Sequence, residues 1–214
     1  MINLGAISNA KVFEFPFKWG IADGLLSADQ QGVQMCDEFP IDSFRYRRYL
    51  SGRYLRRPLV ELDAQDAYRG EELSDAYREL ASDLTSSAYR NAVSNATGID
   101  LEGSPMDAAL WRSDAATELR MHLDSEPKLL THVIYLNHGW TAEDGGKLQI
   151  LASENESDVA FEVLPRFGLS VFIARSPVSW HNITPISSTA PDSRNTLTIN
   201  FYHPGTTSKD LPVR

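Results

Sequence analysis

The sequence of 214 residues contains only one cysteine, Cys36. A single thiol excludes a disulfide within the chain and a metal site built from several thiolates. No apolar run reaches the length of about 18 residues that a membrane-spanning helix needs. The first residues also have neither the basic stretch nor the apolar stretch of a secretory signal. We therefore expect a cytoplasmic protein that does not associate with membranes.

Basic charge is scarce as well, because 20 lysines and arginines face 29 aspartates and glutamates, which gives a net charge of -9. This balance disfavours general nucleic-acid binding. One segment departs from it, since residues 45–57 contain six arginines, three tyrosines and no acid. Two interpretations remain open: a solvated face whose arginines pair with acids elsewhere, or a basic wall for an anionic substrate.

The length allows one domain with a sizeable core. We expect residues 1–214 to form a single domain, in which residues 1–110 supply helical support and substrate-side elements and residues 111–204 form a β core. A long helix is predicted from about Glu71 to Asn95, because apolar residues from Leu73 to Leu84 recur at helical spacing. Gly98 follows just past its end, where glycine is a common helix terminator.

From Leu119 onward, short apolar stretches alternate with turn residues. Six strands are predicted in this half, at Leu119–Leu123, Leu129–Leu136, Lys147–Leu151, Val159–Val163, Leu169–Ala174 and Thr196–Tyr202. So many short strands in about a hundred residues predict a β-sandwich or jelly roll. The expected fold class is mainly β, with N-terminal helices packed against the sheet.

The candidate metal ligands are His122, Asp124 and His181. On a strand, His122 and Asp124 project from the same face, because they are two residues apart. A distant His181 would complete a set of two histidines and one carboxylate, which leaves coordination positions of Fe(II) open. The alternative for each histidine is a core or surface residue, since the HxD pattern alone is a common string.

The last predicted strand alternates strictly between polar and apolar residues from Arg194 to Tyr202. The simplest interpretation places the polar face in water and the apolar face in the core. In a jelly roll with helices outside, the apolar face packs on the helices and the polar face lines the interior. An interior arginine needs an anionic partner, and its planar guanidinium suits a carboxylate. Arg194 would then hold the far carboxylate of a dicarboxylate whose other end reaches the metal.

These elements together resemble the 2-oxoglutarate/Fe(II) dioxygenases, specifically their prolyl-4-hydroxylase-like branch. The resemblance covers about residues 111–203 and is carried, in order, by His122-Leu123-Asp124, Val133 to Asn137, Gly145-Gly146-Lys147-Leu148, Pro165 to Phe172, Trp180-His181 and Arg194 to Phe201. It implies a double-stranded β-helix (jelly roll) buttressed by α-helices. It also implies Fe(II), 2-oxoglutarate and O2 as cofactor and co-substrates. The N-terminal half carries no motif of this family.

The resemblance also assigns roles to individual residues. The two histidines and the aspartate named above would bind Fe(II), and Arg194 would hold the C5 carboxylate of 2-oxoglutarate. Tyr135 matches a tyrosine that donates its hydroxyl to the same carboxylate, although core packing is an alternative role for it. Strand parity adds Thr131 and Thr198 as lesser contacts to the co-substrate.

The expected activity is hydroxylation of an unactivated C–H bond, with succinate and CO2 as co-products. Asp124 favours hydroxylation, desaturation or another two-electron oxidation over halogenation, because halogenating relatives lack this carboxylate. We expect a small-molecule substrate, such as an amino acid or a natural-product intermediate. The alternatives are a prolyl residue of a protein, a non-catalytic cupin-like binding module, and a zinc hydrolase that uses the same ligands.

Substrate contacts are predicted from residues that lie near the ligands in the sequence. They are Trp140, Arg112, Arg175 and Trp180, with Trp111 as a further candidate. For each tryptophan, packing in the core is the alternative. The sequence does not predict an oligomeric state.

Overall fold

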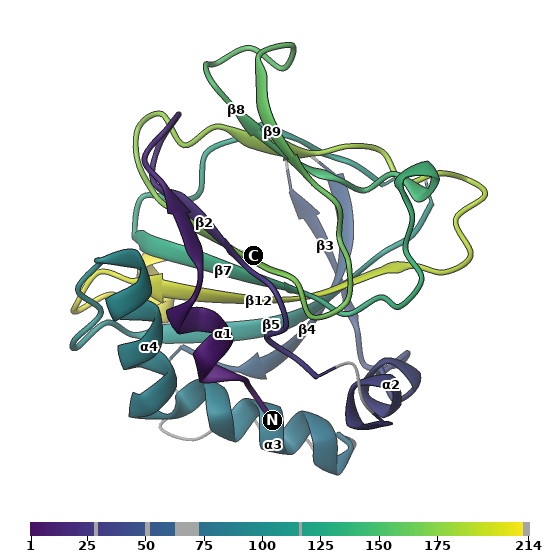
Figure 1. The fold of residues 1–214 in the computed structure, drawn as a ribbon, viewed down its shortest axis with the longest axis horizontal. Helices are drawn as coiled ribbons and strands as arrows, with labels where there is room; N and C mark the ends of the chain where they lie inside the picture. The colour runs from purple at the N-terminus through teal and green to yellow at the C-terminus, as the bar shows by residue number, and fades with distance from the viewer. Residues whose placement is uncertain (28–29, 50–51, 63–72, 116, 212–214) are drawn as a thin grey trace.

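The computed structural model describes residues 1–27, 30–49, 52–62, 73–115 and 117–211. Its strands form an eight-stranded sheet of order β1-β2-β10-β7-β12-β5-β4-β3 and a four-stranded sheet of order β6-β11-β8-β9. The two sheets face each other and helices lie on the outer side of the larger one (Figure 1). The mainly β jelly roll with N-terminal helices is therefore confirmed.

The elements have the following bounds. The larger sheet contains β1 (Lys11–Phe13), β2 (Trp19–Ala22), β10 (Ser170–Ala174), β7 (Lys128–Tyr135), β12 (Arg194–Tyr202), β5 (Met106–Ser113), β4 (Gly52–Val60) and β3 (Arg45–Tyr49). The smaller sheet contains β6 (Leu119–His122), β11 (His181–Ile183), β8 (Leu148–Leu151) and β9 (Val159–Val163). The helices are α1 (Leu4–Ser8), α2 (Gln30–Asp37), α3 (Asp75–Thr85) and α4 (Ser87–Thr97), with short 3-10 turns η1 (Ala142–Asp144) and η2 (Ser208–Asp210).

All six predicted strands of the second half are present, with small shifts at their ends. The strands of the first half were not expected, although β1 to β4 make up half of the larger sheet. Strand β5 was also missed, because its alanines are weak strand formers and its five leading residues are all buried, so that no alternation is visible. The expectation of helical support from residues 1–110 therefore covers only part of that segment.

The long helix predicted from Glu71 to Asn95 is wrong as a single element. Two helices, α3 and α4, meet at Ser86, and residues 71–72 lie outside the described part of the chain. Ser86 has an extended backbone and accepts a hydrogen bond from the Tyr89 backbone N–H at 3.1 Å, which starts α4 with a serine cap. Gly98 ends α4 in the left-handed conformation, as its position in the sequence predicts.

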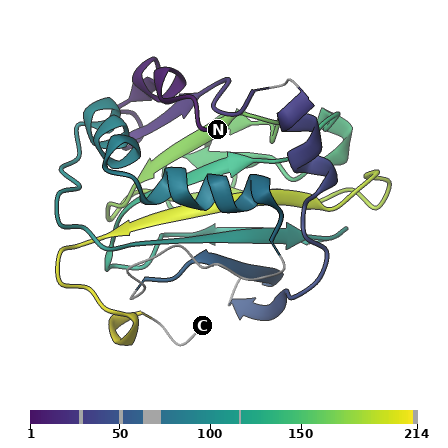
Figure 2. The same ribbon diagram turned by 90° about the horizontal axis from the view of Figure 1, so that it is seen from below.

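The helices cover the outer face of the larger sheet (Figure 2). The alternate apolar residues of β12, Leu197, Ile199 and Phe201, belong to the same buried cluster as helix residues such as Leu80 and Val93. The polar residues of β12 therefore point inward, between the sheets, where Arg194 is only 3% exposed. The prediction that the apolar face meets the helices and the polar face lines the interior is confirmed. In the described part of the chain, no helix has the length and apolarity to cross a membrane.

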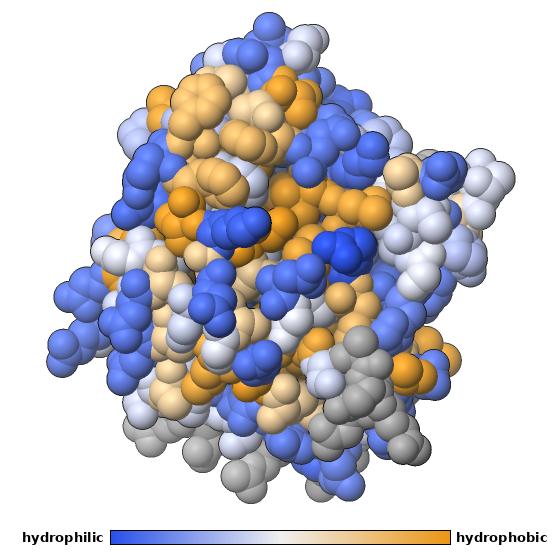
Figure 3. Space-filling model, in the orientation of Figure 1, coloured by the Kyte–Doolittle hydropathy of each residue, from blue (hydrophilic) through white to orange (hydrophobic). Residues whose placement is uncertain are grey.

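A second apolar cluster fills the space between the sheets, and aromatic residues extend it outward. Trp19 of β2 stacks on Phe13 of β1 at a ring distance of 4.6 Å and lies 5.0 Å from Phe161 of β9. On the face seen in Figure 3, apolar side chains gather over β2 and β9. These rings join the N-terminal hairpin to the smaller sheet, so the first residues of the chain help to close the sandwich.

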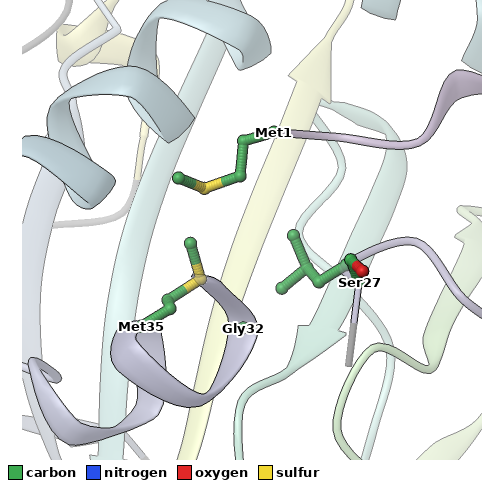
Figure 4. A pocket seen from close by; sticks show the side chains of 5 residues that line it. Met1, Ser27, Gly32 and Met35 are labelled. Carbon is green, nitrogen blue, oxygen red and sulfur yellow. The ribbon is translucent and has the colours of Figure 1, made fainter. Parts of the chain in front are cut away.

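A small pocket lies on the helical side of the molecule, between residues near the N-terminus and α2. It is lined by Met1, Leu26, Ser27, Gly32 and Met35 (Figure 4). Its volume of about 10 Å³ corresponds to about one water molecule. This pocket is therefore too small for an organic substrate.

Candidate metal centre

The three predicted ligands come together at one end of the smaller sheet. His122 ends β6 and His181 begins β11, and the antiparallel register pairs these two residues directly. Their ring centroids are 4.3 Å apart. Asp124 follows β6, and one ligand atom from each of the three residues lies within 4.8 Å of the others. Two separate sequence segments thus form one group of metal-ligating atoms.

Backbone carbonyls fix the tautomers of both histidines. His122 Nδ1 lies 2.9 Å from the Arg120 carbonyl oxygen, and His181 Nδ1 lies 2.9 Å from that of Ser179. Because a carbonyl only accepts, each Nδ1 carries the proton and each Nε2 keeps its lone pair for a metal. Burial lowers the pKa of His122 to about 3, with further contributions from His181 and Lys128, and burial also lowers the pKa of His181. Both rings are thus held neutral, which is the form that binds metals.

Asp124 is held by contacts to both of its carboxylate oxygens. Lys128 Nζ lies 2.5 Å from Oδ1, and the Thr131 hydroxyl donates to Oδ2 at 2.7 Å. Arg175 Nε donates to the backbone carbonyl of Asp124 at 3.3 Å. Burial would raise the pKa of Asp124, but the charge of Lys128 and its hydrogen bond outweigh this effect and hold the pKa well below its usual range. The carboxylate is therefore ionised and oriented.

A chain of polar contacts runs from Asp124 across four neighbouring strands of the larger sheet, toward its β3 edge. The Thr131 hydroxyl is 3.2 Å from Asn200 Oδ1, and the Asn200 amide donates to Asp107 Oδ1 at 2.6 Å. Asp107 Oδ2 is 3.4 Å from an Arg56 guanidinium nitrogen. These residues lie on β7, β12, β5 and β4, which are neighbours in the sheet. The orientation of the aspartate is thus set across four strands.

Sequence reasoning missed most of this network. Thr131 was predicted to contact the co-substrate, whereas its hydroxyl is bonded to Asp124. Lys128, Asp107 and Arg56 were given no role at the metal centre. Asn200 has the same strand parity as Arg194, which is the one signal that pointed inward.

Arg194 and Tyr135 form a polar pair in the interior between the sheets. The guanidinium carbon of Arg194 lies 5.3 Å from the centre of the Tyr135 ring, and Arg194 Nε donates to the Gly146 carbonyl at 2.8 Å. The hydroxyl of Tyr135 is buried beside the Arg194 guanidinium, which can only donate, and no acceptor for the hydroxyl proton is present among the described residues. Burial raises the pKa of Tyr135 against the opposing charge of Arg194, so the hydroxyl keeps its proton. A buried donor without an acceptor costs about 1–3 kcal/mol, and a ligand carboxylate would satisfy it.

The turn Gly145-Gly146 makes room for this arginine. Both glycines have a positive φ, and a Cβ on Gly146 would lie 2.8 Å from Arg194 Cδ. A Cβ on Gly145 would lie 2.2 Å from the Pro185 carbonyl oxygen. The indole N–H of Trp140 donates to the Gly145 carbonyl at 3.0 Å, and the predicted contact of Trp140 with substrate stays a prediction. Trp140 therefore supports the turn that accommodates the arginine.

The other predicted substrate residues differ in their placement. Arg112 Nε contacts Asp114 and Ser193 at 3.2 and 2.9 Å, so this side chain is engaged within the chain. Arg175 holds the backbone of the aspartate ligand, as described above. Trp180 is half-buried next to His181. Three of the four predicted substrate residues thus make contacts within the chain, and the role of all four at the substrate stays a prediction.

Thr198 was predicted as a lesser contact to the co-substrate. It pairs with Val133 in the register of β12 and β7 and is partly exposed. Its strand parity is that of Arg194, which places it on the inward face. Its role at the co-substrate stays a prediction.

The arginine-rich segment forms the hairpin strands β3 and β4 at the edge of the larger sheet. Arg56 pairs with Asp107 and lies 5.8 Å from the Trp111 ring centre, while Arg57 pairs with Asp42 at 3.2 Å. For these two arginines the expected pairing with acids is present, but both side chains are buried, so the expectation of a solvated face is wrong for them. Arg45 is exposed, and the side chains of residues 46–54 lie outside the described set.

Comparison with known proteins identifies the site. Residues 108–202, which include all three ligands, Tyr135 and Arg194, match the model of the 2OG-Fe(II) oxygenase superfamily. The segment 108–202 belongs to the 2OG-Fe(II) oxygenase superfamily. The cofactor and co-substrates of such an oxygenase are Fe(II), 2-oxoglutarate and O2, and the grouping of two histidines and one aspartate agrees with an iron site.

Two curated relatives of this oxygenase are prolyl hydroxylases by name. The chain is 26% identical over 121 residues to prolyl 3-hydroxylase OGFOD1 of Xenopus laevis, over 55% of its own length and 23% of the relative. It is 25% identical over 172 residues to the Mus musculus protein of the same name, over 72% of its own length and 30% of the relative. The chain thus spans less than a third of the length of these relatives.

Solved structures share the oxygenase fold over nearly the whole chain. A prolyl-4-hydroxylase of Pseudomonas putida aligns with a TM-score of 0.62 and 20% identity, over 94% of this chain and 97% of the other. A prolyl hydroxylase of Trichoplax adhaerens, in complex with a peptide fragment of hypoxia inducible factor, aligns with a TM-score of 0.55 and 16% identity, over 86% and 83%. At these identities the likeness shows the fold.

Proposed function

We propose that this oxygenase is an Fe(II)- and 2-oxoglutarate-dependent hydroxylase. The observation that carries the proposal is the placement of three metal-ligating atoms within 4.8 Å of one another, in the same interior as the buried pair Arg194 and Tyr135. The zinc-hydrolase alternative assigns no role to an interior arginine beside a buried tyrosine hydroxyl that lacks an acceptor among the described residues. A dicarboxylate co-substrate would bring an anion to the guanidinium and an acceptor to the tyrosine hydroxyl.

The residues present fit both groups. His122 and His181 would bind Fe(II) through Nε2, and Asp124 through a carboxylate oxygen, which leaves positions open for co-substrate and O2. Arg194 and Tyr135 would hold the C5 carboxylate of 2-oxoglutarate. When bound, the iron supplies the O2 chemistry that converts 2-oxoglutarate to succinate and CO2 and oxidises a C–H bond.

The chain contributes orientation and a dry interior. Backbone carbonyls keep both histidines in the metal-binding tautomer, and Thr131 fixes the aspartate. The apolar residues between the sheets, including Leu148, Ile150 and Val171, exclude water from the space next to the ligands.

For the substrate, we propose a prolyl residue of a peptide or protein. The support is that both curated relatives are named prolyl 3-hydroxylases, and that prolyl hydroxylases are among the structures with the same fold. A small-molecule substrate stays an alternative prediction. The exposed Arg45 at the edge strand β3 is compatible with an acidic group on either kind of substrate.

The central experiment is an anaerobic titration of Fe(II) into the metal-free protein with 2-oxoglutarate. We expect a visible metal-to-ligand charge-transfer band, and its absence in folded protein would refute the proposed co-substrate. His181→Ala should abolish both the band and succinate formation. The matched control is His203→Ala, because His203 is exposed and outside the ligand group. Equal loss in both variants would mean that His181 is not a specific ligand.

The substrate class is tested separately, by the stimulation of succinate formation. Proline-containing peptides and free amino acids are offered to the iron-loaded protein, and products are examined for an added oxygen by mass spectrometry. We expect stimulation by peptides. Stimulation by free amino acids alone would establish the small-molecule alternative.

A further inference from the structure

Lys128, the first residue of β7, reaches into the metal centre. Its side chain is only 13% exposed, and its Nζ lies 2.5 Å from Asp124 Oδ1 and 3.3 Å from the Thr131 hydroxyl. The backbone N–H of Lys128 donates to the Ser125 carbonyl at 3.1 Å, within the turn that follows the aspartate. Lys128 therefore contacts the loop that carries the metal ligand twice, through its backbone at Ser125 and through its ammonium at Asp124.

The chain itself engages both oxygens of the Asp124 carboxylate. The Thr131 hydroxyl takes Oδ2 and the Lys128 ammonium takes Oδ1. A divalent ion bound by the three ligands needs one of these oxygens. The hydroxyl is neutral and can keep its bond beside a metal. The ammonium has the same sign of charge as the ion, and like charges at such distances in a buried site repel strongly.

We propose that Lys128 is an internal counter-ion that occupies Asp124 in the metal-free protein and is displaced when the divalent ion binds. The inference rests on the proposed metal site and deepens it, because it makes metal affinity the outcome of a competition between two cations. The metal-free fold also benefits from this lysine. A buried carboxylate without a counter-ion is costly, so Lys128 stabilises the fold before the metal arrives.

The competition gives an effect that simple structural damage does not produce. Removing the lysine charge should strengthen metal binding, whereas a disturbed ligand loop would weaken it. The two variants are Lys128→Met, which keeps the length of the side chain, and Lys128→Gln, which keeps a hydrogen-bond donor for Asp124 without the charge. The second variant protects the test against a fold that fails without any partner for the carboxylate.

The experiment measures the Kd of Mn(II) for the metal-free full chain by electron paramagnetic resonance, without 2-oxoglutarate. We expect both variants to bind Mn(II) at least about tenfold more tightly than the wild type. The matched control is Lys147→Met, whose ammonium pairs with Glu162 at 3.2 Å on the smaller sheet. The Kd of this control should equal that of the wild type.

A second readout is the melting temperature with and without Mn(II). Metal-free Lys128→Met should melt below the wild type, and Mn(II) should raise its melting temperature by more than it raises that of the wild type. Equal or weaker Mn(II) binding in both variants, with binding in the wild type intact, overturns this inference alone. No Mn(II) binding to any of the proteins overturns the proposed function as well.

Discussion

Tyr135 shows at the scale of one residue that packing and polar roles need not exclude each other. Its ring belongs to the apolar cluster between the sheets, together with residues such as Leu148 and Val171. Its hydroxyl is nevertheless buried beside Arg194, and the described part of the chain offers no acceptor for its proton. The two roles that the sequence left as alternatives are thus both compatible with one position.

Tyr135→Phe keeps the ring and removes only the hydroxyl. If the hydroxyl donates to the co-substrate carboxylate, the apparent KM for 2-oxoglutarate should rise about 10-fold or more, because a hydrogen bond to a charged group contributes about 1.5–3 kcal/mol. Mn(II) affinity should stay unchanged. Steady-state succinate formation and a separate metal titration check both parts. An unchanged KM would leave the packing role as the only one.

His132 is a buried histidine outside the metal centre, and it makes stability depend on pH. Its Nδ1 lies 2.7 Å from the Tyr89 hydroxyl, and its ring stacks on Phe172 at a centroid distance of 4.0 Å. Burial lowers the pKa of His132 from 6.5 to about 3. Below about pH 6.5 this histidine is therefore protonated in the unfolded chain, whereas in the folded chain it stays neutral down to about pH 3. The stability contributed by the neutral ring is complete above that pH and is lost as pH falls toward 3.

His132→Gln should remove this part of the pH dependence. When the pH falls from 7 to 5, one such histidine lowers the unfolding free energy of the wild type by about 2 kcal/mol. The decrease in unfolding free energy over the same pH range should therefore be about 2 kcal/mol smaller in the variant. Urea unfolding of the metal-free proteins at both pH values measures the difference. His203→Gln is the control, because His203 is exposed. The same slope in wild type and His132→Gln would contradict the prediction.

At the scale of elements, the turn before β8 and the strand β12 form one unit. The carbonyl oxygen of Gly146 accepts a hydrogen bond from Arg194 Nε, and the absence of a Cβ on Gly146 leaves space for the arginine side chain. The position of the co-substrate arginine thus depends on a turn about fifty residues away in the sequence.

Gly146→Ala should displace the Arg194 side chain. The apparent KM for 2-oxoglutarate should then rise by about 10-fold or more, because the displaced guanidinium loses its charge-assisted hydrogen bond to the C5 carboxylate. Gly24→Ala is the matched control. Gly24 also has a positive φ, but a Cβ there meets nothing within 4 Å. Both variants should lose about 1 kcal/mol of stability from backbone strain. Only the Gly146 variant should change the KM, and a change in both would point to general destabilisation.

At the scale of the whole molecule, the proposed site joins the two sheets. His122 and His181 come from the smaller sheet, whereas Tyr135 and Arg194 come from the larger one. A metal ion with 2-oxoglutarate would therefore connect both layers of the sandwich, and ligand binding should stabilise the entire fold.

We expect Mn(II) and 2-oxoglutarate together to raise the melting temperature more than either alone. A ligand at about 100 times its Kd stabilises by about 2.7 kcal/mol, which corresponds to a rise of roughly 5–10 °C for a domain of this size. Differential scanning fluorimetry in the presence and absence of chelator measures the rise. In Asp124→Ala the rise with Mn(II) should disappear, and its persistence would place the ion elsewhere.

The sequence alone predicted the features that depend on local patterns. The period of two in β12 placed Arg194 on one face with the other polar residues, and the expected jelly roll turned that face inward. The spacing within His122-Leu123-Asp124 predicted two neighbouring ligands, although β6 ends at His122 and Asp124 follows it. The strands of the second half follow from the same period and from turn residues between them. These signals are local because side-chain direction along a strand is fixed by its backbone geometry.

Only the tertiary structure decided which residues surround the aspartate and which are engaged elsewhere. The contacts of Lys128, Asn200 and Asp107 depend on strand register and on side-chain reach, which no single segment encodes. The same applies to Trp140 and Arg112, which lie near the ligands in the sequence but bond to turns and loops in space. The sequence determines the chemical type of each side chain. Which groups that side chain contacts depends on the packing of strands that are distant along the chain.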